Sequence, residues 1–217
     1  TETATAAALY YLIHSTLTAG AMFLVVDQVR ARRGNSALSP QAPMPGGGLV
    51  AAFFFLAAIA AVGMPPLSGF LGKLMILDAI RDQSWWVWGW ALVLGTSLIA
   101  LVGYARAGSA LFWKPFDNAA PVADDFTPED GALSGWGQAA LGVLIALIVA
   151  LTVLAGPVSR YARATAAQLY TPEAYIDAVL GTPQERAARA AREQALADQV
   201  HGADHAAPAH SATQEGH

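Results

Sequence analysis

Five apolar stretches follow one another along the chain, separated by short segments that are polar or rich in glycine and proline. They cover residues 6–29, 49–62, 67–80, 86–113 and 133–154. A helix of about 20 apolar residues is long enough to cross the hydrocarbon core of a bilayer. We therefore predict five membrane spans within residues 1–157, forming an all-α, polytopic transmembrane helix bundle.

The pattern changes after residue 157. Aromatic and aliphatic residues of 158–180 are interleaved with charged ones, as in a helix that lies along a membrane or a neighbouring subunit. Residues 183–199 are rich in Ala, Arg, Glu and Gln, which favours a solvated helix. We predict amphipathic and solvated helices over 158–199 and a disordered, histidine-containing tail over 200–217.

Helix-breaking residues interrupt the apolar pattern between the second and third stretches. They are Pro65, Pro66, Gly69 and Gly72, and they predict the hinge of a broken helix. Irregular backbone at membrane depth is tolerated only where it is buried in protein or lines a cavity. The break therefore indicates a functional position rather than a loop at the membrane surface.

Three ionisable residues lie well inside the predicted spans: His14, Lys73 and Arg106. Such residues are costly in a membrane and usually line a polar path. Lys73 beside the break suggests an ion or proton pathway, or else a lysine whose amine reaches the interface. His14 suits a proton relay, or else a hydrogen bond to a neighbouring helix. Arg106 stays protonated, so it is a candidate electrostatic gate or loop anchor and not a proton carrier.

Composition supports a membrane protein and excludes several other classes. Charged residues make up 13% of the chain and hydrophobic residues 55%, whereas soluble domains carry about 25% charge. The net charge of −4 and the absence of a dense basic patch argue against nucleic acid as a partner. The chain opens with Thr-Glu-Thr-Ala and no initiator Met, which suggests a C-terminal piece of a longer protein.

Enzyme and metal signatures are missing from the sequence. It has no cysteine, Walker loop, GxGxxG or HExxH, so we expect no enzyme activity and no cofactor. The tail histidines are spaced by four, five and seven residues, which matches no compact metal site. These residues are His201, His205, His210 and His217.

Two stretches resemble a known family, the proton-conducting antiporter-like subunits. Residues 8–24 are similar to a late helix of these proteins. Residues 63–73, which contain the sequence Pro-Pro-Leu-Ser-Gly-Phe-Leu-Gly-Lys, are similar to the broken helix that follows it. The family joins the Mrp/Pha-type cation/proton antiporters with the membrane arm of respiratory complex I. Residues 106–115 and 168–181 resemble the D subunits of the antiporters.

The resemblance implies a fold, a function and residue roles. The chain would supply the last five of about fourteen spans of a subunit in a bacterial inner-membrane complex that exchanges Na⁺ or K⁺ for H⁺. Its partners would be the other antiporter subunits and the lipid bilayer. Lys73 would be the terminal lysine of the proton path and His14 the relay before it. Thr18 stands where many relatives carry a lysine, so the relay would depend more on His14 and water.

The sequence leaves both the orientation of the tail and the function open. Arginines at 30, 32, 33, 81, 160 and 163 place the tail in the cytoplasm by the positive-inside rule, whereas the resemblance implies the outer face. A proton-pumping subunit of an NADH:quinone oxidoreductase or related hydrogenase would share the fold. A non-transporting membrane scaffold would tolerate neutral replacement of Lys73 and His14.

Overall fold

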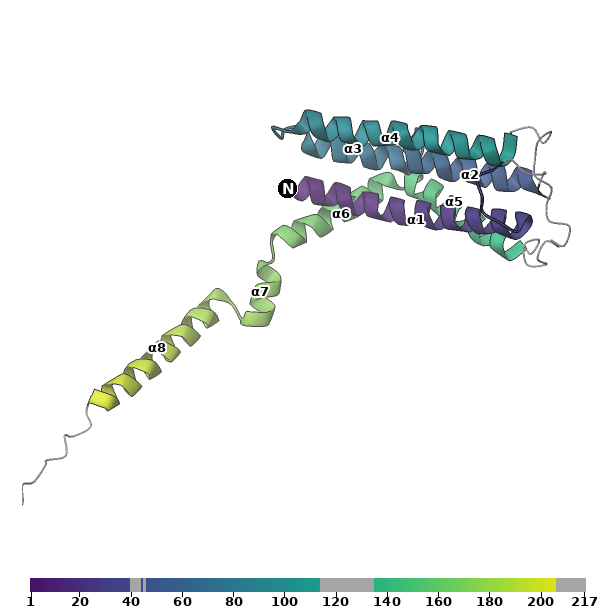
Figure 1. Cartoon of the computed structure of the whole chain (residues 1–217). Helices are drawn as coiled ribbons and strands as arrows, with labels where there is room; N and C mark the ends of the chain where they lie inside the picture. Colours follow the sequence, from purple (N-terminus) through teal and green to yellow (C-terminus); the bar gives the residue numbers. More distant parts are fainter. Residues whose placement is uncertain (40–43, 45, 114–134, 206–217) are drawn as a thin grey trace, which may run out of the picture. The chain divides into compact units, whose positions relative to one another are not determined.

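The computed structural model describes residues 1–39, 44, 46–113 and 135–205. Every regular element in this part of the chain is helical, which confirms the all-α prediction (Figure 1). The helices are α1 Glu2–Arg33, α2 Gly47–Val62, α3 Ser68–Ile80, α4 Trp86–Gly108, the π-helical turn η1 Ser109–Trp113, α5 Gly135–Val153, α6 Ala155–Tyr170, α7 Glu173–Leu180 and α8 Pro183–His205.

Local sequence explains where α1 begins and ends. Thr1 caps the N-terminus, because its side-chain oxygen accepts a hydrogen bond from the Ala4 backbone N–H at 3.3 Å. Gly34 follows the last residue in a left-handed conformation, with φ 74°, and its N–H donates to the Arg30 carbonyl at 2.8 Å. Only glycine adopts this conformation at little cost, so the helix ends there.

The helices α2 and α3 are successive halves of one pass through the bundle. Near the start of α4, Trp90 donates from Nε1 to the Leu77 carbonyl of α3 at 3.1 Å. Further along α4, the ring of Tyr104 lies 6.3 Å from that of Phe54 in α2. A single helix thus runs antiparallel to α3 and then to α2, and the two appear one after the other in Figure 1.

Helix lengths agree with this arrangement. Residues 2–33, 86–113 and 135–153 are long and apolar enough to cross a membrane. In contrast, α2 has 16 residues and α3 has 13, or about 24 and 20 Å at 1.5 Å per residue, short of a bilayer core of about 30 Å. The stretches 49–62 and 67–80, expected as two spans, therefore form two short helices that lie end to end along α4.

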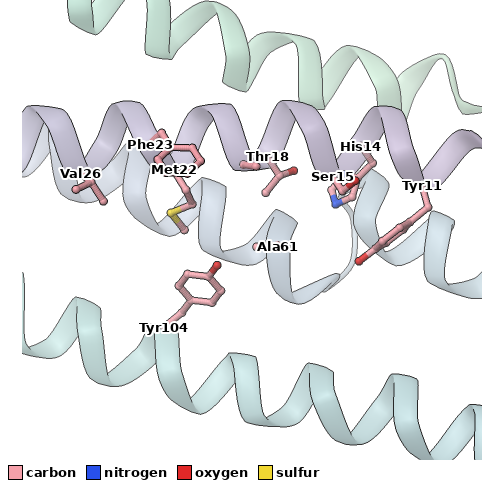
Figure 2. Close-up of a pocket in the computed structure, with 10 residues that line it drawn as sticks. Tyr11, His14, Ser15, Thr18, Met22, Phe23, Val26, Ala61 and Tyr104 are labelled. Atoms are coloured by element: carbon pink, nitrogen blue, oxygen red, sulfur yellow. The ribbon is translucent and has the colours of Figure 1, made fainter.

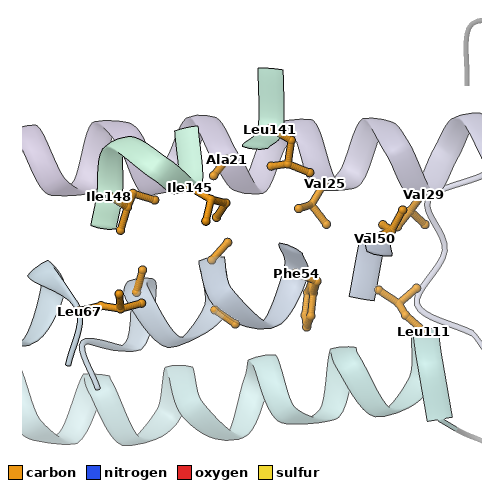
Figure 3. Packing of buried hydrophobic residues seen from close by; sticks show 13 residues of the cluster. Ala21, Val25, Val29, Val50, Phe54, Leu67, Leu111, Leu141, Ile145 and Ile148 are labelled. Atoms are coloured by element: carbon orange, nitrogen blue, oxygen red, sulfur yellow. The ribbon is translucent and has the colours of Figure 1, made fainter. Parts of the chain in front are cut away.

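The main core lies where α1, α2 and α5 meet (Figure 3). Its buried side chains come from all three helices, with Leu111 of η1 at one end; they include Val25, Val29, Val50, Phe54, Leu141, Ile145 and Ile148. The helices α1 and α5 pack closely at Gly20, where an added Cβ would make an ordinary van der Waals contact, 3.5 Å from Leu144 Cδ1. Apolar side chains of α4 such as Leu92 and Ile99 face outward.

The chain divides into two compact units, residues 1–167 and 168–217. The boundary falls within α6 rather than after residue 157, because Ala162 and Ala166 pack against Ala6 of α1. This part of the amphipathic region expected over 158–199 therefore belongs to the bundle.

The second unit contains α7 and α8. Thr182 and Glu185 form a capping box, in which the Thr182 N–H donates to Glu185 Oε2 at 2.8 Å. Arg186 pairs with Asp177 at 3.4 Å and joins the two helices. Helix α8 continues to His205, so the disordered tail expected from residue 200 does not begin there. Residues 206–217, with His210 and His217, lie outside the described residues.

The core predicts a difference between two leucines of equal size. Leu141→Ala removes a side chain that is fully buried, and it should lower stability by about 2 kcal/mol or more. Leu92→Ala removes a side chain that is 67% exposed and should cost much less. Thermal unfolding in detergent, monitored by the helical circular dichroism signal, measures the stability of both variants. An equal loss of stability in the two would contradict this packing.

Candidate functional site

The break between α2 and α3 comprises residues 63–67. Gly63 takes a left-handed conformation with φ 77°, and its N–H donates to the carbonyls of Ile59 and Ala60. Pro65 and Pro66 follow, joined by a cis peptide bond, and α3 begins at Ser68. Both prolines therefore lie where the sequence predicts.

The glycines expected at the hinge, Gly69 and Gly72, lie inside α3 instead. A Cβ on Gly69 would collide with the Ala60 carbonyl oxygen and lie 2.7 Å from His14 Nε2. A Cβ on Gly72 would lie 2.9 Å from Tyr11 Cδ2. Their role is steric: these glycines allow α1, α2 and α3 to approach closely and do not supply unusual backbone angles.

His14 is buried in the middle of this contact, with 2% of its surface exposed. Its Nδ1 lies 2.9 Å from Ser68 Oγ, and its Nε2 lies beside Gly69, next to the carbonyl oxygen of Ala60. A carbonyl can only accept, and Nε2 is the ring atom that lies beside Gly69 with the Ala60 oxygen. We therefore assign the proton of the neutral ring to Nε2, so that Nδ1 accepts from the Ser68 hydroxyl.

Ser68 can serve both protonation states of His14. Its Oγ lies 3.5 Å from the Ile148 carbonyl as well as 2.9 Å from Nδ1, and the side chain is fully buried. When Nδ1 gains a proton it donates to Ser68 Oγ, and the single hydroxyl hydrogen then turns to Ile148. The site thus holds an acceptor for the hydroxyl in each state.

Lys73 binds the end of α2 across the break. Its Nζ donates to the carbonyl of Val62, the last residue of α2, at 2.6 Å, and to Ser97 Oγ of α4 at 2.6 Å. The last carbonyls of a helix lack partners within the helix and carry its negative dipole end, which favours a cation. None of the ion pairs among the described residues includes Lys73, so neutral oxygens hold its charge.

The structure brings His14 and Lys73 together and sets Arg106 apart. Both lie at the break, His14 beside Gly69 and Lys73 beside Gly63. Arg106 is exposed, and it follows Ser97 by nine residues on the same helix, which is a rotation of about half a turn. It lines a separate pocket with Leu38 and Ile99. Its predicted role is therefore independent of the other two residues.

A pocket of about 390 Å³ opens beside His14, between α1, α2 and α4 (Figure 2). Tyr11, Thr18 and Tyr104 contribute polar groups to its lining. Thr18 is 4% exposed, and its Oγ1 has no hydrogen-bond partner among the residues that the structure describes. Because a water occupies about 30 Å³, several fit, and one beside Thr18 would supply the missing bond.

Sequence reasoning missed three features of the site: the carbonyl of Val62, the left-handed Gly63 and Ser97. A cap glycine at the end of an apolar run was a readable signal for Gly63. No signal in the sequence identifies which polar group of a neighbouring helix meets Lys73.

Comparison with known proteins places this site in a family. Residues 1–100 match the family model described as NADH:quinone oxidoreductase/Mrp antiporter, transmembrane region. The match includes His14, the break, Lys73 and Ser97. This part of the chain belongs to the family. Together with the long apolar helices, it makes the chain a multi-pass membrane protein.

Curated relatives extend the similarity beyond residue 100. The chain is 29% identical over 212 residues to the D subunit of a probable K⁺/H⁺ antiporter of Rhizobium meliloti, covering 82% of the chain and 37% of the relative. It is 32% identical over 182 residues to the D subunit of a Na⁺/H⁺ antiporter of Bacillus subtilis, covering 80% and 34%. A third relative, NADH-quinone oxidoreductase subunit 14 of Thermus thermophilus, is 32% identical over 155 residues, covering 68% and 32%. The chain spans about a third of the length of these relatives.

The close approach at Gly69 predicts the effect of a single methyl group. Gly69→Ala places a Cβ against the Ala60 carbonyl and the His14 ring, so it should displace α3 and destabilise the bundle by about 1–3 kcal/mol. Gly95→Ala adds the same methyl in α4, where nothing lies within 4 Å, and should be neutral or slightly stabilising. Thermal unfolding in detergent compares them. Equal stability of the two variants would contradict the packing of the break.

Proposed function

We propose that this chain is part of the D subunit of a multisubunit monovalent cation/proton antiporter in a bacterial cell membrane. It would carry part of the transmembrane proton path, coupled to efflux of Na⁺ or K⁺. The names of the R. meliloti and B. subtilis relatives support the antiporter assignment. The observation that carries the proton path is the position of Lys73, held by neutral oxygens at a broken helix beside a buried histidine.

The geometry supports a mechanism in which His14 passes protons toward Lys73. Water in the pocket at Thr18 and Tyr104 would deliver a proton to the region of His14. Ser68 accommodates the protonated and the neutral ring, so the exchange needs no large movement. Positive charges on His14 and Lys73 repel each other, because few polar groups screen them at this depth. Uptake at one therefore favours release from the other.

The chain would hold only part of the transporter. The chain spans about a third of its relatives, so the cation path and the rest of the proton path would come from further sequence and from partner subunits. We propose that Arg106 anchors the end of its helix at the membrane surface, because it is exposed and on a different side of α4 from Ser97.

A second candidate is a proton-pumping subunit of an NADH:quinone oxidoreductase. The T. thermophilus relative favours it, since its identity to this chain equals that of the B. subtilis protein. Purification of the intact complex distinguishes the two candidate functions. Iron–sulfur and flavin subunits would accompany the oxidoreductase, whereas small membrane subunits without cofactors would accompany the antiporter.

Replacement of Lys73 tests the proton path. In everted vesicles, Na⁺ or K⁺ should collapse a respiration-generated pH gradient with the complete wild-type complex and fail to do so with Lys73→Ala. Lys73→Arg should fail as well, because a guanidinium keeps the charge but does not release a proton. Arg106→Gln, which alters the remote arginine, should retain antiport. Pull-down of the partner subunits shows that each variant assembles.

Three outcomes would contradict the proposal. Antiport that survives in Lys73→Ala would remove Lys73 from the path. Antiport that survives in Lys73→Arg alone would leave Lys73 as a fixed charge that does not carry protons. If cations never collapse the gradient with the wild-type complex, the oxidoreductase candidate is favoured.

A further inference from the structure

Among the described residues of α4, Ser97 is the one that hydrogen-bonds to Lys73, with a distance of 2.6 Å from Nζ to Oγ. The residue is half-buried and faces the break between α2 and α3. It lies across the ammonium group from a helix end, since the same Nζ donates to the Val62 carbonyl at 2.6 Å. Lys73 therefore connects α4 to the pass formed by α2 and α3.

The orientation of the Ser97 hydroxyl is set by a second hydrogen bond. Its Oγ donates to the Val93 carbonyl, one turn earlier in α4, at 2.7 Å. A hydroxyl has a single hydrogen, so Oγ presents a lone pair to Lys73. The oxygens of Val62 and Ser97 thus both direct negative partial charge at the amine. This arrangement stabilises the protonated form of Lys73 more than the neutral form.

We propose that Ser97 is a positioning residue for Lys73, which holds the charged amine at the end of α2 and sets the pH range over which the lysine exchanges its proton. When Lys73 loses its proton, the Ser97 hydroxyl turns from the Val93 carbonyl and donates to the amine nitrogen. The proposal rests on the proposed function, in which Lys73 carries protons.

The neighbouring residue provides a matched control. Thr96 also carries a hydroxyl, which donates one turn back to the Leu92 carbonyl at 2.7 Å. Thr96 is exposed, and its hydrogen bonds are to carbonyls of its own helix. Removing the Thr96 hydroxyl therefore changes the polarity of α4 at the same depth without changing the surroundings of Lys73.

The experiment measures antiport against pH in everted vesicles with the complete complex carrying Ser97→Ala, Ser97→Thr or Thr96→Ala. Ser97→Ala removes an acceptor from the charged amine, so Lys73 releases its proton more readily and the profile moves to lower pH. The expected shift is about one pH unit, the equivalent of one hydrogen bond to a charged group. Ser97→Thr retains the hydroxyl and should restore the wild-type profile, and Thr96→Ala should not change it.

Failure of this inference is distinguishable from failure of the proposed function. If Lys73→Ala abolishes antiport but Ser97→Ala has the pH profile of Thr96→Ala, Ser97 does not position the lysine and the proton path stands. If Lys73→Ala is active, the proposed function fails first. Should Ser97→Ala not assemble, Ser97→Cys replaces it, because a thiol has a similar shape but is a weak acceptor. An unshifted profile in Ser97→Cys overturns the inference equally.

Discussion

The hydrogen bond from Lys73 Nζ to the Val62 carbonyl is the interaction on which the site depends. Breaking a helix inside a membrane leaves backbone groups without partners in surroundings that contain little water. The lysine amine supplies a donor at the end of α2, and the helix end supplies negative charge for the amine. The charged amine and the break in the backbone would each be unfavourable alone, and the hydrogen bond between them stabilises both. The same contact fixes which way α4 faces, because Ser97 completes the surroundings of the amine.

Close packing of small residues then brings the second ionisable group to this position. With Gly69 against Ala60 and His14, α1 approaches the break closely enough for the histidine to hydrogen-bond Ser68 of α3 and to lie beside the Ala60 carbonyl of α2. A larger residue at 69 would separate these helices, and His14 would lose its contact with Ser68. The pocket beside His14 follows from the same geometry, because α4 faces α1 across it through Tyr104.

The sequence predicted the helices and the break well, because both depend on local chemistry. Apolar length defined the helical ranges, and Pro65 and Pro66 marked the interruption. It did not show that α2 and α3 share one pass, since stretches of about 14 apolar residues fit either half of a broken span or a short span of their own. The roles of Gly69 and Ser97 depend on neighbours distant in sequence. A glycine or serine in an apolar helix has the same local pattern whether it faces a partner or lipid.

The protonation of Lys73 tests the central claim most directly. We would follow its amine by ¹⁵N NMR in the complete complex in lipid, across the pH range in which cations collapse the pH gradient, and assign the signal by its loss in Lys73→Arg. The account predicts that the amine changes between charged and neutral forms within that range, and that His14→Gln alters the transition. An amine that stays protonated throughout the range would contradict the account, because Lys73 would then be a fixed charge at the end of α2.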